Sequence, residues 1–100
     1  MARVWKPCRV RCKLRRGIFK DEYLARIVSV DAQGRRKDVH AFVFGDTVQV
    51  ERSPDSTGES SGAVKAHCVG RRKGRAAVIL PQSTLENGPS ILVPESELVS

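Results

Sequence analysis

The sequence has few aromatic residues, no long apolar run and no cysteine framework. No apolar run approaches the ~20 residues needed to cross a bilayer, and the basic N-terminus lacks the apolar core of a secretory signal. These absences argue against membrane and secreted classes, so we predict a cytoplasmic protein with no membrane partner. Aromatic residues make up only 5% of the 100 residues, which favours contacts to a nucleic-acid backbone or duplex over stacking on single strands.

The three cysteines, Cys8, Cys12 and Cys68, are an odd number in a chain without a secretory signal. Cys8 and Cys12 lie on one predicted strand about 13 Å apart, too far for a disulfide. A bond from Cys68 to either of them stays open geometrically. The redox compartment favours three reduced and mostly buried thiols.

Catalytic and metal-binding motifs are also missing. His40 and His67 add ligand atoms to those of the cysteines, but structural zinc sites use tight pairs such as C-x2-C presented from turns. Here the spacing is C-x3-C within a strand, and His67 and Cys68 point to opposite faces. No P-loop, dinucleotide fingerprint, metalloprotease motif or nucleophile elbow occurs. We therefore predict no metal, no cofactor and no enzymatic activity.

What the sequence does contain is strands. "CRVRCKLR" alternates strictly, with cysteine, valine and leucine on one face and cations on the other, which is the clearest local signal. Further strands are predicted over 22–30, 37–51 with a bulge or corner at Gly45 and Asp46, and 91–99. "AVKAHCV" and "RAAVILP" form a hairpin around "GRRKG". The only helical turn is predicted in "PESEL".

Loops separate these strands. Residues 52–62 are rich in Ser, Gly and Pro and are predicted to form a mobile loop, and 82–90 form a second loop. The whole chain, 1–100, is thus predicted to be one all-β domain, a small antiparallel barrel or sandwich of five to six strands. "VHAFVFGDTVQV" and "SILVPESELV" echo each other, which suggests two repeated three-stranded halves, 8–50 and 63–99.

"ILVPESELV" after "AAVILP" resembles the ending of Src-homology-type (SH3-like) small β-barrels. In that ending a Val-Pro pair, a short 3₁₀ turn and a final apolar strand close the barrel, here Val93-Pro94, Glu95 to Glu97, and Leu98-Val99. The peptide-binding members carry an "ALYDY"-type segment and a tryptophan pair, whereas this chain has only Trp5. The resemblance therefore implies the wider group of small barrels, many of which contact RNA or DNA through basic loops, and no proline-binding groove.

Positive charge is concentrated in two segments. The net charge is +7, and residues 1–20 and 63–80 contain no acid. The four cations of "CRVRCKLR" project from one strand face about 7 Å apart, and Arg-Arg pairs mark three turns. In a simple meander the turns at 34–37 and 70–75 lie at one end of the sheet and the turn at 15–17 at the other. We predict a nucleic-acid-binding surface from Arg9, Arg11, Lys13, Arg15, Arg16, Phe19, Arg35, Arg36, Lys37, Arg71, Arg72, Lys73 and Arg75.

Two alternatives stay open at this point. Acids on neighbouring strands (Asp21, Glu22, Asp38 and Glu51) or phosphates neutralise the basic strand face. The partner is RNA or DNA, or else the chain is an interaction or accessory module that docks on an acidic protein or on a second copy as a homodimer. Phe19 is the preferred stacking residue and Trp5 the second, while Tyr23, Phe42 and Phe44 are expected in the core.

Overall fold

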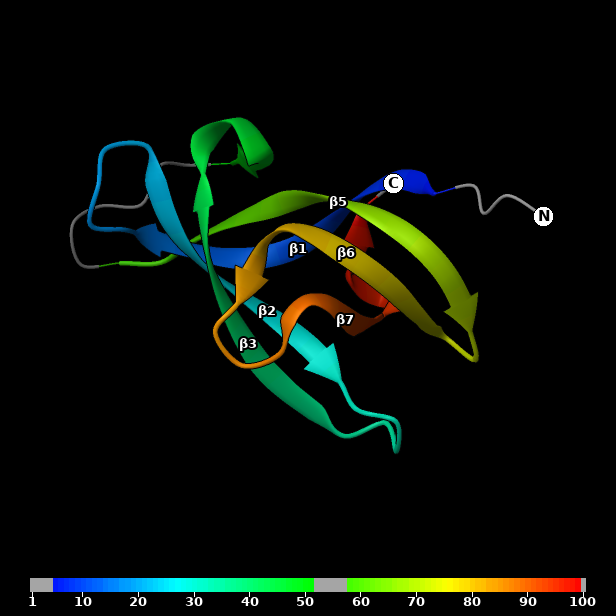
Figure 1. Cartoon of the computed structure of the whole chain (residues 1–100). Coiled ribbons are helices and arrows are strands. Elements are labelled where there is room, and N and C mark those ends of the chain that lie inside the picture. Colours follow the sequence, from blue (N-terminus) through cyan, green and yellow to red (C-terminus); the bar gives the residue numbers. More distant parts are fainter. Residues whose placement is uncertain (1–4, 52–57, 100) are drawn as a thin grey trace.

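The computed structural model describes residues 5–51 and 58–99, which form eight β-strands and two 3₁₀ turns (Figure 1). In chain order they are β1 (Lys6–Arg16), β2 (Glu22–Val30), β3 (Arg36–Phe44), η1 (Gly45–Thr47), β4 (Val48–Val50), β5 (Ser60–Arg72), β6 (Arg75–Thr84), β7 (Gly88–Pro94), η2 (Glu95–Glu97) and β8 (Leu98–Val99). The all-β prediction is confirmed. The six longer strands match the upper end of the predicted number, and β4 and β8 are additional short strands.

The strands form one curled antiparallel sheet. Its hydrogen-bonded order is β3-β2-β1-β5-β6-β7, while β4 pairs with β5 and β8 pairs with β1. The curl brings β2 against β7 and β3 against β6, so the sheet encloses its core as a half-barrel (Figure 1). The predicted simple meander is wrong, because β5 pairs with β1 and not with β4 alone.

β1 and β5 form the centre of the sheet. Val10 pairs with Val64, and each of these valines pairs on its other side with a short strand, Val64 with Val48 and Val10 with Leu98. β4, from the first half of the chain, thus completes the pairing of β5 in the second, and β8 does the same for β1. The two halves are interleaved.

The core follows from the alternation in β1. Val10, Cys12 and Leu14 are buried, while the cations between them face outward. Burying a side chain such as Val or Leu contributes roughly 1.5–3 kcal/mol. The three cysteines are free, with Cys12 and Cys68 buried and Cys8 half-buried, as predicted. Burial raises the pKa of the Cys12 thiol to about 12, so this side chain is a neutral core residue.

Several predicted boundaries move. β5 begins at Ser60, inside the segment predicted as the loop 52–62, and residues 52–57 lie outside the described residues. Gly62 is buried there because Leu14 and the carbonyl oxygen of Gln49 occupy the space beside it. The second predicted loop, 82–90, shrinks to a turn at 85–87 between β6 and β7. The predicted corner at Gly45 is confirmed as η1, which separates β3 from β4.

Of the three aromatic residues expected in the core, Phe42 and Phe44 were placed wrongly. Phe44 is 46% exposed, Phe42 is half-buried, and only Tyr23 packs against the core, from its edge. Ala41 and Val43 are the buried residues of this part of β3. Because side chains alternate along a strand, Phe42 and Phe44 lie on the opposite, outer face.

Candidate functional site

The two basic turns predicted to share one end of the sheet do so. The β2–β3 turn and the β5–β6 hairpin both lie at the lower right of Figure 1. Nη1 of Arg75, at the start of β6, donates hydrogen bonds to the main-chain oxygens of Asp31 and Ala32, at 3.3 and 2.9 Å. The meander assumption was wrong, but β5 runs antiparallel to β1 as β2 does, so the two hairpins still project in one direction.

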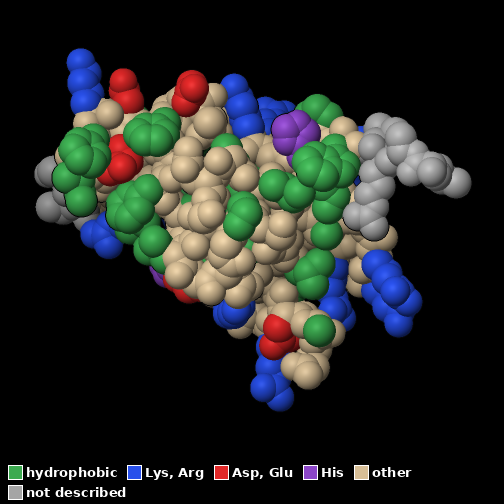
Figure 2. Space-filling view, in the orientation of Figure 1, with side chains coloured by type: hydrophobic (Ala, Val, Ile, Leu, Met, Phe, Trp, Pro, Cys, Tyr) green, Lys and Arg blue, Asp and Glu red, His purple; other side chains and the backbone are tan. Residues whose placement is uncertain are grey.

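We call the cations of these two turns the basic-turn surface: Arg35, Arg36, Lys37, Arg71, Arg72, Lys73 and Arg75. All are exposed except Arg75, which is half-buried. Arg71 to Lys73 and Arg75 line a hollow of about 530 Å³ together with Ala32 and Leu92. Lys and Arg side chains project from this end in Figure 2.

Carboxylates are few beside this surface. Asp31 uses its Oδ1 atom within its own turn, where it accepts hydrogen bonds of 2.9 Å from the backbone N–H groups of Gln33 and Arg35. Glu95 adjoins the hairpin, since its backbone N–H donates to the oxygen of Gly74 at 2.9 Å. Among the described residues, no member of the basic-turn surface forms a salt bridge. The positive charge of these turns therefore faces solvent largely uncompensated.

The hairpin turn itself has an unfavourable residue. Lys73 and Gly74 connect β5 to β6 with φ angles of 54° and 78°, and a type I′ hairpin turn has positive φ at both of these positions. Glycine and asparagine are the usual residues for positive φ, whereas lysine carries a Cβ that crowds the backbone there. The hairpin keeps a cation at its tip at a local conformational cost.

The basic strand face of β1 is partly engaged by other side chains. The Arg9 guanidinium contacts Oε1 of Gln49, and Nζ of Lys13 donates to Oγ of Ser61 at 3.0 Å. Arg9, Arg11, Lys13 and Arg26 line a groove of about 540 Å³. Glu51 and Glu97 also line this groove, so its charge is mixed.

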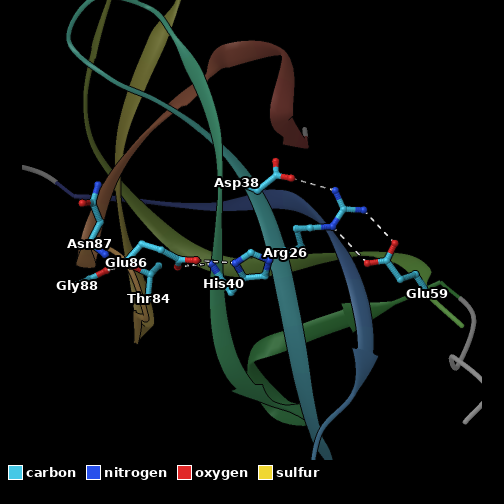
Figure 3. Close-up of polar contacts among 8 residues, drawn as sticks. All are labelled: Arg26, Asp38, His40, Glu59, Thr84, Glu86, Asn87 and Gly88. Atoms are coloured by element: carbon cyan, nitrogen blue, oxygen red, sulfur yellow. Dashed lines mark hydrogen bonds and ion pairs between the residues drawn. The ribbon is translucent and has the colours of Figure 1, made fainter. Parts of the chain in front are cut away.

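Arg26 is the centre of the acidic contacts near β1 (Figure 3). Its Nη1 lies 3.3 Å from Oδ2 of Asp38 and its Nη2 lies 2.9 Å from Oε1 of Glu59. The hydrogen bond from Arg26 lowers the pKa of the Glu59 carboxyl, and the charges of Arg15 and Lys13 lower it further. Sequence reasoning named Asp38 as a neutralising acid but missed Glu59, which lies inside the segment 52–62 that was predicted as a loop.

The third arginine pair, Arg15 and Arg16, lies apart from the basic-turn surface. It ends β1 at the opposite end of the sheet, beside the β1–β2 loop that carries Phe19, as predicted from counting strands. Phe19 is 69% exposed. The sequence-predicted residues therefore fall into three groups. These are the basic-turn surface, the β1 cations Arg9, Arg11, Lys13 and Arg15, and the end of β1 and the β1–β2 loop with Arg16 and Phe19.

A second polar cluster fixes the β6–β7 turn to β3 (Figure 3). Oε2 of Glu86 lies 2.6 Å from Nδ1 of His40, and Oε1 accepts the backbone N–H of His40 at 2.7 Å. The backbone N–H of Leu85 donates to the oxygen of His40 at 2.7 Å. The side-chain hydrogen bond with His40 lowers the pKa of the Glu86 carboxyl. Sequence reasoning weighed His40 only as a zinc ligand.

Within residues 5–51 and 58–99, no three His, Cys, Asp or Glu side chains gather closely enough to hold a metal ion. In the same part of the chain, no helix has the length and apolarity to cross a membrane. The chain matches no protein-family model, no curated protein and no solved structure.

Proposed function

We propose that this protein is a non-catalytic module that binds the phosphate backbone of nucleic acid, RNA or DNA, through the basic-turn surface. The observation that carries the proposal is the contact between Arg75 and the β2–β3 turn. It joins two cation-rich turns that are distant in sequence into one exposed surface. Arginine is well suited to this role because its planar fork matches phosphate oxygens.

The expected binding is electrostatic and sequence-independent. Contacts of this kind release counterions, so the logarithm of the affinity falls linearly with the logarithm of salt concentration. Contacts to about five phosphates give a slope of about −4.5 on a duplex and about −3.5 on a single strand.

The test is a titration of labelled duplex DNA between about 50 and about 200 mM salt. Arg71→Glu combined with Arg72→Glu should weaken binding to all sequences alike and flatten the salt slope. Arg16→Glu combined with Lys20→Glu makes the same charge change at the other end of the sheet and should have a much smaller effect on duplex binding. A flat salt response of the native protein, or equal losses in both double variants, would refute the proposal. A flat salt response would leave docking on an acidic protein or on a second copy as the remaining candidate function.

We also propose that the fold is an SH3-like barrel built from two repeated halves. Each half has three strands, a 3₁₀ turn and a short strand in the same order. The backbone N–H at the start of η1, on Gly45, donates to the oxygen of Asp21 in the first hairpin, and Glu95 of η2 donates to Gly74 in the second hairpin. Superposition of 8–50 on 63–99 tests this proposal, and disagreement in the position of the 3₁₀ turns would refute it.

A further inference from the structure

Large apolar side chains lie exposed at the end of the sheet that carries the β1–β2 loop. Ile18 is 82% exposed, Phe19 69% and Phe44 46%. Phe42 and Leu24 are half-buried on the same outer face of β2 and β3, where they are cross-strand partners. Figure 2 shows hydrophobic side chains gathered over this end. We call these five residues the aromatic face.

The loop that carries Ile18 and Phe19 is held in place by Glu22. Oε1 of Glu22 accepts the backbone N–H groups of Ile18 and Phe19, at 2.8 and 3.3 Å. The main chain of Glu22 also bonds to Gly17 and to Phe19, at 2.8 and 3.1 Å. A Cβ on Gly17 would lie 2.5 Å from Glu22 Oε1, so a larger residue there would displace the Glu22 carboxylate from these hydrogen bonds. The loop is therefore preorganised with both apolar side chains pointing to solvent. Exposed apolar surface of this kind marks interaction sites.

Cations are interleaved with these apolar side chains. Arg15 of β1 pairs across the sheet with Leu24, whose partner on β3 is Phe42. In the next row Lys13 pairs with Arg26, and Arg16 and Lys20 flank the loop itself. One carboxylate oxygen of Glu22 already accepts hydrogen bonds from backbone N–H groups. Glu59 is engaged by Arg26.

We propose that the aromatic face binds unpaired bases of a single-stranded nucleic acid, with Phe19 and Phe44 as stacking residues and the β1 cations along the strand's phosphates. Proteins that hold single strands combine these two elements, a cationic track and exposed aromatic rings. This inference rests on the proposed function and names its substrate class. The low aromatic content favoured duplex binding, but the exposure of these rings at one end of the sheet favours a single strand at this site.

A protein partner would also cover exposed apolar residues, but charge favours nucleic acid. The row Arg15–Leu24–Phe42 places a cation beside two of the apolar side chains, and Lys13 lies two positions along β1 on the same face. An apolar protein surface offers nothing to these cations, whereas a phosphate backbone pairs with them while its bases stack.

The test compares a labelled uridine homopolymer with a duplex of the same length, at equal salt. Phe19→Ala combined with Phe44→Ala should lower single-strand affinity by about 5- to 150-fold for each base that loses its stacking side chain. The same variant should change duplex affinity less than about twofold. Phe19→Leu combined with Phe44→Leu keeps the apolar surface and removes only the rings. It should reproduce most of the loss, because stacking and not hydrophobic contact is the interaction.

Three results would overturn the inference. The first is unchanged single-strand affinity in the alanine variant with native circular dichroism. The second is equal loss for single strand and duplex. The third is full affinity in the leucine variant, which indicates an apolar contact of the kind a protein partner makes. Failure of the proposed function is measured separately, as a flat salt response of the native protein on duplex DNA, so it is distinguishable from all three results.

Discussion

Arg75 reaches across from the β5–β6 hairpin to the β2–β3 turn and donates a 2.9 Å hydrogen bond from Nη1 to the main-chain oxygen of Ala32. The carbonyl oxygen of Asp31 accepts a second bond from the same atom. Nη2 of Arg75 is also the atom that a Cβ on Gly34 would meet, at 3.6 Å. The arginine thus lies along the β2–β3 turn and fixes the spacing of the two basic turns, in addition to carrying a charge.

Arg75→Gln should weaken duplex binding more than Arg72→Gln does, although both remove one positive charge. Losing the Arg72 charge removes one phosphate contact and reduces the salt slope by about 1. Losing Arg75 also frees the β2–β3 turn, so we expect about a tenfold loss of affinity against about threefold for Arg72→Gln. Fluorescence anisotropy over a salt series measures both. Equal losses would mean that Arg75 acts through charge alone.

Lys73→Asn should make the protein more stable and a weaker binder. Asparagine tolerates the positive φ of this position better than lysine, so we expect a gain of about 0.5–1 kcal/mol in the free energy of unfolding. The hairpin tip loses its cation at the same time. Lys37→Asn, within β3, removes a charge without relieving strain and should weaken binding with no gain in stability. Urea unfolding and duplex titration separate the two effects. A Lys73→Asn variant less stable than the native protein would contradict the backbone strain inferred at Lys73.

The contact between His40 and Glu86 should make stability depend on acid pH. A carboxyl whose pKa is lower in the folded than in the unfolded state stabilises the fold above its unfolded pKa, and this stabilisation is lost as the pH falls through the folded pKa. For Glu86 the loss begins near the ordinary value of 4.5 and continues below it. The Tm difference between the native protein and Glu86→Gln should therefore shrink as the pH falls from about 5 toward about 3.

His40→Gln removes the hydrogen bond that is the main cause of this pKa shift. The Tm of His40→Gln should therefore fall less steeply with acid pH than the Tm of the native protein, as the Tm of Glu86→Gln does. A Tm difference that persists unchanged at the acid end would show that the Glu86 carboxyl contributes nothing through its ionisation.

Gly62→Ala should destabilise the fold, whereas Gly70→Ala should not. A Cβ at Gly62 would come within 2.5 Å of Leu14 Cδ1 and 2.7 Å of the Gln49 carbonyl oxygen, which belongs to the paired strand β4. Overpacking of this kind costs about 1–3 kcal/mol. A Cβ at Gly70, in the same strand, meets nothing within 4 Å, so its replacement should stay within about 0.5 kcal/mol. Chemical denaturation of both variants tests the pair, and similar stability would contradict the close packing.

Strict alternation made β1 predictable, and the glycine and arginine turns revealed which hairpins share an end. "VHAFVF" was different, because apolar residues occupy both faces and periodicity alone does not choose between them. The curled interior takes the smaller side chains, Ala41 and Val43, and leaves Phe42 and Phe44 outside. The Ser- and Gly-rich composition around Gly62 indicated a loop, but the pairing of β5 with β1 and β4 overrides it. Such long-range pairing, like the Arg26–Glu59 contact, leaves no local signal.

The interleaving of the two halves constrains how the chain reaches its native state. The hairpins β1–β2 and β5–β6 join neighbouring segments and are able to form early. The other edge of β1 needs β5, and the edge that β2 leaves open at Arg9 and Val10 needs β8; both come from the opposite half. Contacts of such large sequence separation make folding slow, in the millisecond to second range typical of barrels. During synthesis β1 emerges with that edge unpaired, open to association with other chains. Of these eight strands β8 is synthesised last, and it pairs with the first, β1.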